Sequence, residues 1–225
     1  MKSVFKSLPV IGALLLVAGC AFGLLSLSAT SGKNPPTYRQ AVVAPSEPMS
    51  NAVLFFWYGC PHCKHLEERF RQEQGAQQIN LALGAGNAEF EKVPAPINAV
   101  WELHARLFYA LSHAGVSDET HWKVMNVIQD ESLNSNLKIM SAIPSFIGFE
   151  KSINPDFSAD SSVVSADLYS PATNAAISRA KNLVAQLGIV GVPTMLVNQH
   201  DVLELGRGLS YDNILPETLR LLKLP

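Results

Sequence analysis

A continuous apolar run that stops at a glycine constrains the fold of this chain more than any other feature. Residues 52–58 read Ala-Val-Leu-Phe-Phe-Trp-Tyr, which is rich in β-forming residues and short enough for a strand buried on both faces of a sheet. Gly59 ends the run, and Leu66 and Phe70 then follow at the spacing of one helical face. A fully buried strand that leads directly into a helix indicates an α/β protein.

The rest of the chain predicts strands near its end and helices in its middle. Helical spacing covers 100–111 and continues after Asp118, and a further helix over 137–143 is expected to stop or bend at Pro144. The expected elements also include a strand at 90–93, a polar loop at 154–165, a helix at 171–187 capped by Ser170, a hairpin of 194–197 with 202–205, and a terminal helix at 215–223. We also expect an outward-facing ion pair between Glu67 and Arg71 on the helix after Gly59. The fold class is therefore α/β, with a sheet interrupted by a helical subdomain.

The chain divides into three parts. Residues 1–29 form an export segment, residues 30–51 are rich in Pro, Ser and Asn as in an extended linker, and residues 52–225 form one folded domain with a helical insertion at about 99–187.

The export segment leaves three outcomes open. Lys2 and Lys6 precede an apolar run, as in a signal sequence, and Val17-Ala18-Gly19-Cys20 is similar to a bacterial lipobox, which would make Cys20 a lipidation site. The apolar run continues past Cys20 and approaches the length of a membrane-spanning helix, so an uncleaved anchor is the second outcome. Cleavage near Ser28 or Ala29, which would release a soluble protein, is the outcome we favour least. The first two place the folded domain in the periplasm and tethered to a membrane.

Composition argues against two classes of protein. A formal charge of −2 over 225 residues, without a basic stripe, does not favour nucleic-acid binding. Three cysteines, of which two lie two residues apart, do not make a scaffold of several structural disulfides.

Cys60-Pro61-His62-Cys63 supplies the chemistry that the sequence predicts. Two thiols at this spacing can form a tight disulfide, and the free N–H groups at a helix start lower the pKa of the first cysteine. We therefore predict Cys60 as the nucleophile and Cys63 as the resolving thiol, while Pro61 stiffens the turn. His62 places a donor or a partial positive charge beside the Cys60 thiolate, which favours the reduced form and so makes a stronger oxidant.

Gly191-Val192-Pro193 is a second motif, just before a predicted strand. A cis bond between Val192 and Pro193 would place a backbone edge beside the disulfide, where a substrate chain could pair; a trans proline at a strand edge is the alternative that the residues leave open.

The run Phe55-Phe56-Trp57-Tyr58-Gly59-Cys60-Pro61-His62-Cys63, together with Gly191-Val192-Pro193, resembles the DsbA family of bacterial disulfide-forming oxidoreductases. The resemblance implies a thioredoxin fold, oxidation of newly exported reduced proteins, reoxidation by a DsbB-like quinone-linked membrane protein, and a cis bond before Pro193. We expect a monomer that uses no cofactor and no metal.

One position departs from the family pattern. Relatives commonly carry a buried acid six positions before the first active-site cysteine, and here that position is Leu54. The proton acceptor for Cys63 is thus open, and water or another group would have to serve.

Other functions remain alternatives. The same dithiol could act in a periplasmic reductase or isomerase, and Cys60, His62, Cys63 and His65 supply four donor side chains for a metal. An inert structural disulfide is a further alternative. His104, His113, His121 and His200 are scattered, and we assign them no role.

Overall fold

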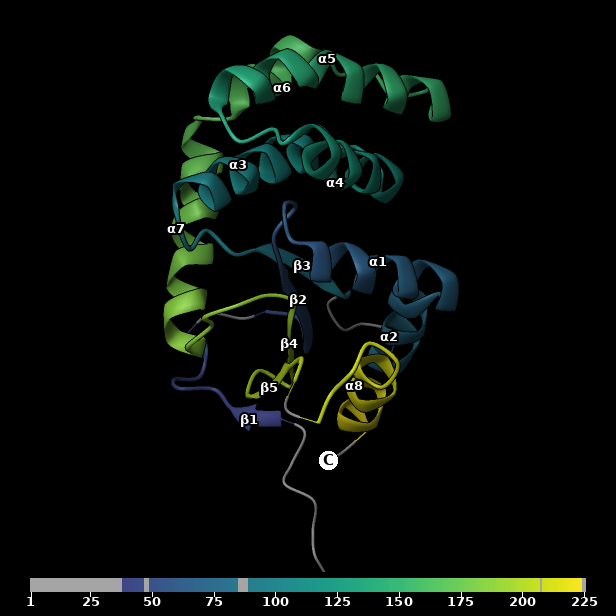
Figure 1. The fold of residues 1–225 in the computed structure, drawn as a ribbon, viewed down its shortest axis with the longest axis vertical. Helices are drawn as coiled ribbons and strands as arrows, with labels where there is room; N and C mark the ends of the chain where they lie inside the picture. Colours follow the sequence, from purple (N-terminus) through teal and green to yellow (C-terminus); the bar gives the residue numbers. More distant parts are fainter. Residues whose placement is uncertain (1–37, 47–48, 85–88, 207, 224–225) are drawn as a thin grey trace, which may run out of the picture. The chain divides into compact units, whose positions relative to one another are not determined.

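The computed structural model describes residues 38–46, 49–84, 89–206 and 208–223 (Figure 1). The elements in chain order are β1 (Tyr38–Gln40), β2 (Ala52–Phe56), α1 (Pro61–Glu73), α2 (Gly75–Leu83), β3 (Glu91–Pro94), α3 (Ala99–His113), α4 (Asp118–Glu131), α5 (Asn136–Ile153), α6 (Ser161–Asp167), α7 (Pro171–Leu187), β4 (Thr194–Val197), β5 (Asp201–Glu204) and α8 (Ile214–Leu222). The predicted export segment, including Cys20, lies outside the described residues. None of the helices in the described ranges combines the length and the apolar character that a membrane crossing needs.

In the described part of the chain, the sheet has five strands in the order β1-β5-β4-β2-β3. β2 pairs in parallel with β3, with Leu54 opposite Lys92, and antiparallel with β4, with Val53 opposite Leu196. β4 and β5 form the predicted hairpin, and β1 adds to its outer edge. The strand that leads to the cysteine motif is thus an interior strand, paired on both sides.

Both faces of β2 are buried, as its continuous apolar run predicts. Val53 and Phe55 pack in a cluster with Leu183 and Leu187 of α7. Alternate residues of the same strand belong to a larger cluster that also contains side chains of α1, α2, α3, α4, α5 and α8. The sheet therefore has α7 on one face and α1 and α8 on the other.

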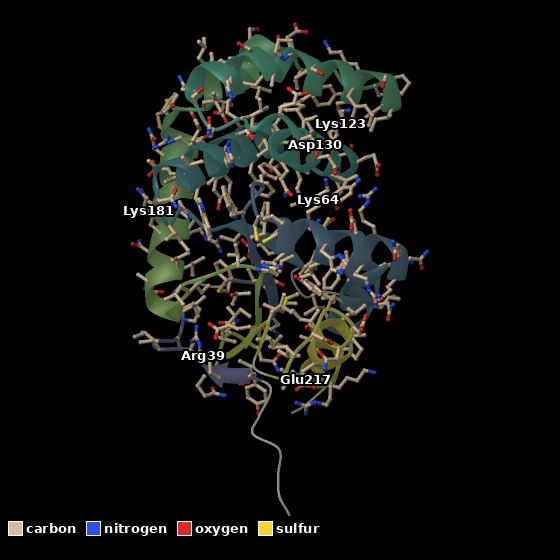
Figure 2. The ribbon with its side chains drawn as sticks, in the orientation of Figure 1. Arg39, Lys64, Lys123, Asp130, Lys181 and Glu217 are labelled. Carbon is tan, nitrogen blue, oxygen red and sulfur yellow. The ribbon has the colours of Figure 1, made fainter. Side chains whose placement is uncertain are left out.

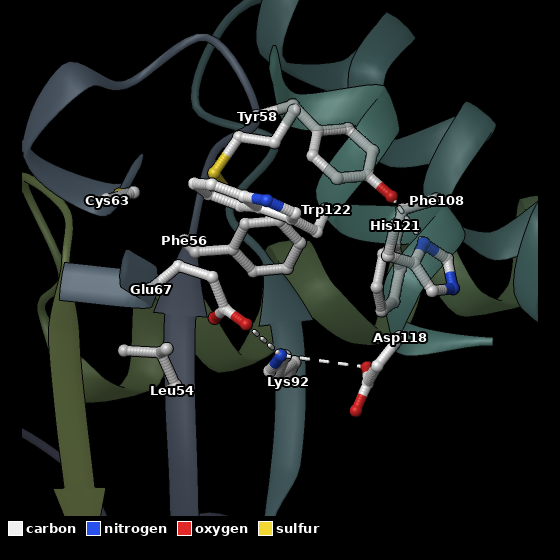
Figure 3. A pocket seen from close by; sticks show the side chains of 11 residues that line it. Leu54, Phe56, Tyr58, Cys63, Glu67, Lys92, Phe108, Asp118, His121 and Trp122 are labelled. Carbon is white, nitrogen blue, oxygen red and sulfur yellow. Dashed lines mark hydrogen bonds and ion pairs between the residues drawn. The ribbon is translucent and has the colours of Figure 1, made fainter. Parts of the chain in front are cut away.

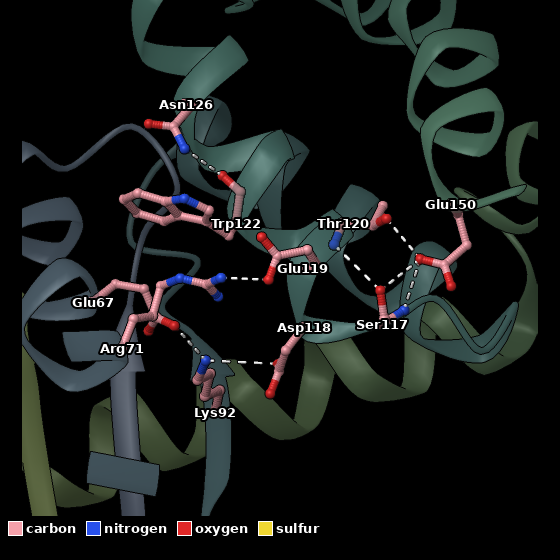
Figure 4. A network of polar contacts seen from close by, with 10 residues as sticks. All are labelled: Glu67, Arg71, Lys92, Ser117, Asp118, Glu119, Thr120, Trp122, Asn126 and Glu150. Atoms are coloured by element: carbon pink, nitrogen blue, oxygen red, sulfur yellow. Dashed lines mark hydrogen bonds and ion pairs between the residues drawn. The ribbon is translucent and has the colours of Figure 1, made fainter. Parts of the chain in front are cut away.

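The helices α3 to α7 separate β3 from β4 in the sequence, so the predicted interruption of the sheet by a helical block is confirmed (Figure 1). The start of α4 is fixed by a buried acid of α5. Glu150 accepts hydrogen bonds from Ser117 N at 3.0 Å, from Ser117 Oγ at 2.7 Å and from Thr120 Oγ1 at 2.6 Å (Figure 4). These bonds satisfy groups that a helix start leaves unpaired, and they hold α4 where it faces α1.

Four local predictions were wrong or incomplete. α5 runs through Pro144 without stopping, because the loss of one backbone hydrogen bond is offset by the burial of Ile143, Phe146 and Ile147 on either side. α6 occupies part of the predicted polar loop, because Val164 is buried. Helix α2 was not predicted, and β1 lies inside the segment that we expected to be an extended linker.

Arg39 explains why part of that segment is ordered. Its guanidinium donates to the carbonyl oxygens of Leu187 and Gly188 at 2.9 Å each, and pairs with Glu204 at 2.9 Å. Figure 2 labels Arg39 near the end of α7. One side chain thus joins β1, β5 and the C-terminal end of α7, where free carbonyls favour a cation.

Candidate active site

The strand-to-helix junction places Cys60 at the N-cap of α1. Its backbone is extended, and its Sγ accepts a hydrogen bond from Cys63 N at 3.3 Å. Pro61 takes the first helical position, where a missing N–H has no consequence. Gln129 of α4 donates to the carbonyl oxygens of Tyr58 at 2.7 Å and Cys60 at 3.2 Å, which ties the turn to the helical block.

The two cysteines lie in different electrostatic surroundings. Both are buried thiols, with 6% of Cys60 and 3% of Cys63 exposed. The pKa of Cys60 is lowered from 9.0 to about 6, first by the hydrogen bond with the Cys63 side chain and then by the backbone N–H groups of Cys63 and His62, against the opposing effect of burial. The pKa of Cys63 is raised, mainly by burial and by its hydrogen bond with Cys60. These opposite shifts favour the thiolate on Cys60, and the role of Cys60 as the nucleophile stays a prediction.

The second predicted motif lies beside Cys60. The Val192–Pro193 bond is cis, as the family resemblance implies. The carbonyl oxygen of Val192 is 3.5 Å from the Cys60 Sγ, although the two residues are far apart in the sequence. The structure therefore brings Cys60, Cys63, Val192 and Pro193 together at one end of β2 and β4.

A groove of about 620 Å³ opens next to this junction. It is lined by the predicted residues His62, Val192 and Pro193 and by residues of β4, β5 and the loop before α8: Val190, Gly191, Thr194, Glu204, Leu205, Gly206, Leu209, Ser210 and Tyr211. Its walls are largely apolar, and its lining residue Val192 contacts the Cys60 sulfur, so an extended peptide segment could lie there.

His62 does not stand alone at the surface. Its Nδ1 is 2.5 Å from the hydroxyl oxygen of Tyr211, and the Tyr211 ring meets the His65 ring edge-on with centroids 4.3 Å apart. Sequence reasoning missed Tyr211, because it lies in a loop far from the motif and no local pattern marks it.

The cavity below Cys63 holds an acid that the sequence analysis assigned wrongly. A cavity of about 20 Å³, about the space of one water molecule, is lined by Cys63, Leu54, Glu67, Lys92 and Asp118, among others (Figure 3). Glu67 is only 9% exposed and pairs with Lys92 at 2.9 Å, while Asp118 lies 3.6 Å from the same ammonium.

The predicted pair between Glu67 and Arg71 does not form. Arg71 instead pairs with Glu119 of α4 (Figure 4). The physical reason is that Leu54 pairs in register with Lys92, which brings the lysine under the first turns of α1. Figure 2 also labels Lys64 and Asp130, whose ion pair at 3.8 Å is a further link between α1 and α4.

Two histidines that we left without a role, the buried His104 and the half-buried His121, contact the aromatic residues that follow β2. Trp57 Nε1 donates to His104 Nδ1 at 2.8 Å, and the Trp57 ring stacks on Trp101 with centroids 4.5 Å apart. The hydroxyl oxygen of Tyr58 is 2.5 Å from His121 Nδ1. Burial lowers the pKa of both histidines, that of His121 to about 4, so both are neutral near pH 7. Each has a second polar contact at Nε2, His104 with the Leu133 carbonyl oxygen at 2.7 Å and His121 with Ser112 Oγ at 3.3 Å.

A metal site is not apparent at the motif. Within the described residues, no three His, Cys, Asp or Glu side chains are arranged to hold an ion. Cys63 points into the protein below the motif, while His62 and His65 both contact Tyr211.

The chain is similar in sequence to known thiol:disulfide interchange proteins. No protein-family model matches the chain. The thiol:disulfide interchange protein DsbA of Pseudomonas syringae pv. tomato is 28% identical over 196 residues, which cover 85% of this chain and 83% of that protein. DsbA of Burkholderia cepacia is 28% identical over 218 residues, with coverage of 93% and 91%.

The fold is similar to that of solved DsbA structures. The crystal structure of Pseudomonas aeruginosa DsbA has a TM-score of 0.63 at 24% identity and covers 80% of this chain and 88% of its own. A Proteus mirabilis DsbA variant with the non-covalently bound peptide PWATCDS has a TM-score of 0.66 at 16% identity, with coverage of 84% and 97%. The predicted thioredoxin fold with an inserted helical subdomain is confirmed.

Proposed function

We propose that this chain, which is similar to DsbA proteins over most of its length, is a thiol:disulfide oxidoreductase of the DsbA family that introduces disulfide bonds into exported proteins by exchange at Cys60 and Cys63. The observation that carries the proposal is the pairing of a nucleophile whose pKa is lowered to about 6 with a resolving cysteine whose pKa is raised. A stabilised Cys60 thiolate favours the reduced protein, and a dithiol that favours its reduced form is an oxidant toward clients.

Oxidation of a client proceeds in two exchanges. A client thiolate attacks Cys60 Sγ of the oxidised protein, forms a client–Cys60 disulfide, and expels Cys63 as a thiolate that takes up a proton. A second client thiolate then attacks the client sulfur of that mixed disulfide and expels Cys60 as a thiolate. The client loses two electrons, which the Cys60–Cys63 pair gains. The low pKa of Cys60 makes it a good leaving group in the second exchange.

We propose Val192 and Pro193 as the site where the client chain lies during these steps. Their backbone borders Cys60, with the Val192 carbonyl 3.5 Å from its sulfur, and the groove of about 620 Å³ continues from them. The peptide bound to Proteus mirabilis DsbA makes a peptide ligand a reasonable occupant of this groove as well.

Glu67 is our candidate for the proton acceptor that Leu54 cannot provide. During reoxidation Cys63 must lose a proton before it attacks the mixed disulfide, and its raised pKa makes that step difficult without a base. Glu67 lines the same cavity as Cys63, and Lys92 and Asp118 connect it toward solvent, since the Asp118 side chain is 71% exposed. The proton would pass from the Cys63 thiol to the Glu67 carboxylate and then to water.

The setting follows from this activity. We propose that the protein acts in the periplasm on reduced exported chains and is reoxidised by a DsbB-like quinone-linked membrane protein. The N-terminal segment, with either a lipidated Cys20 or an uncleaved anchor, would hold the domain at the membrane, and the monomer remains our expectation.

The equilibrium reduction potential in a glutathione redox buffer tests the direction of the reaction. A value near the DsbA family's own reference potential of about −120 mV supports the oxidase, whereas a value toward about −270 mV identifies a reductant and refutes the proposal. His62→Ser should move the potential in the reducing direction and raise the pKa of Cys60. An unchanged Cys60 pKa would remove the role we give to His62.

A further inference from the structure

The loop before α8 is fastened to the active-site helix through consecutive side chains. The hydroxyl of Tyr211 contacts His62 Nδ1 at 2.5 Å, and the next residue, Asp212, pairs with Arg69 of α1 at 2.9 Å. Asn213 Oδ1 accepts from Ser210 N at 2.6 Å, which closes the loop on itself. Tyr211 is therefore held in place by its own loop and by α1.

The contact to His62 suits both protonation states of the ring. A tyrosine hydroxyl can donate to the free nitrogen of a neutral imidazole and can accept from an imidazolium N–H. When the hydroxyl donates to Nδ1, the proton of the neutral ring is on Nε2. The ring plane is also fixed, because Tyr211 stacks along His62 at 24° and rests edge-on against His65.

Tyr211 also belongs to the groove beside the nucleophile. It shares that groove with His62, Val192 and Pro193. The pKa of Tyr211 is raised by partial burial and by the nearby charge of the Cys60 thiolate. A peptide that fills the groove would touch Tyr211 and, through it, His62.

We propose that Tyr211 is a positioning residue for disulfide exchange, whose hydroxyl holds the His62 imidazole beside Cys60 and links occupation of the groove to the charge around the nucleophile. The role of Tyr211 in disulfide exchange rests on the proposed function. The contact between Tyr211 and His62 is the same whether the protein oxidises or reduces its clients. The titratable groups around this contact are Cys60, Cys63 and His65 on α1, with Asp212 of the loop paired to Arg69.

Tyr211→Phe tests the proposal in the full-length reduced protein. The phenyl ring keeps the contacts with His65 and the groove wall, and only the hydroxyl is lost. We expect the pKa of Cys60, followed by the ultraviolet absorbance of its thiolate, to rise by about half a unit, which is an about threefold loss of thiolate stabilisation. The reduction potential should then become more negative by about 14 mV, since tenfold in the exchange constant is about 30 mV.

Two comparisons separate this role from a structural one. Tyr169→Phe removes a hydroxyl that bonds Asn136 on the surface, and it should leave the Cys60 pKa unchanged. In a His62→Ser background, Tyr211→Phe should add no further shift. An unchanged Cys60 pKa in Tyr211→Phe overturns the proposal, and so does an equal shift with and without His62. The thiolate pKa is measured on the isolated protein, so the result stands even if the potential shows a reductant.

Discussion

The charge on Cys60 should make the stability of the reduced protein depend on pH in a way that one substitution can isolate. In the folded protein the pKa of Cys60 is about 6, against 9.0 for the unperturbed thiol. A group with a lowered folded pKa contributes stability that is complete above the unfolded value and is lost as the pH falls through the folded value. The window for Cys60 is therefore between about pH 6 and about pH 9.

The size of the effect follows from the two pKa values. Linkage gives at most about 0.4 kcal/mol at pH 6, about 1.4 kcal/mol at pH 7 and about 2.7 kcal/mol at pH 8. Solvent in the adjacent groove screens part of this, so we expect a rise of at least about 1 kcal/mol between pH 6 and pH 8.

Cys60→Ser is the reference, because a serine at the N-cap can still accept from Cys63 N while it carries no charge. The assay is urea unfolding of both proteins under reducing conditions at several pH values, with the free energy of unfolding extrapolated to water. Titration of the groups that do not interact with Cys60 cancels in the difference, and Cys63, whose pKa is raised, stays protonated in the folded protein over this pH range. If the difference between the two proteins stays constant or shrinks as the pH rises, the thiolate does not stabilise the fold and the argument for an oxidising dithiol fails.

Two further substitutions test the surroundings of the motif. Glu67→Gln should slow the attack of Cys63 on the mixed disulfide by at least about tenfold near pH 7, because the cavity loses its base. Rapid-mixing oxidation of the reduced protein by oxidised glutathione measures this, and Glu119→Gln, which removes the same charge on the surface, should be normal; equal rates for both variants would exclude Glu67 as the acceptor. Gly59→Ala should lower the free energy of unfolding by about 1–3 kcal/mol, because its Cβ would lie 2.3 Å from the Trp57 ring. A thermal or urea unfolding curve that matches the wild type would show that the indole can move aside.

The sequence predicts best what depends on neighbours along the chain. The buried run at 52–58, the cysteine motif at a helix start and the capped helix that begins at Pro171 are local patterns, and the structure has each of them. Glu67 shows the limit of such reasoning. Its spacing to Arg71 is correct for an ion pair on one helix, but Lys92, which lies on β3, pairs with Glu67 instead.

The same limit explains the other misses. Tyr211 contacts His62 only because the loop before α8 folds back on α1, and no sequence pattern near Tyr211 predicts this contact. Helix α2 is only nine residues long, and its Ile79, Leu81 and Leu83 follow one another at every second position, which is not the spacing of a helical face. The features that could not be predicted are contacts between segments far apart in the sequence, because no local spacing of residues indicates them.

The pairing of β2 with β4 sets the order in which this molecule can be assembled during synthesis. Ala52 lies opposite Val197, and the whole helical block is made between them. Helical contacts close in sequence can form while the chain is still emerging, whereas a distant strand pair must wait for its second partner. The cysteine motif is therefore synthesised long before Val192, the residue that contacts Cys60 in the folded protein. We expect the emerging chain to carry both thiols before Val192 and Pro193 can lie beside them, so that disulfide exchange with a client begins only after β4 has been made and paired with β2.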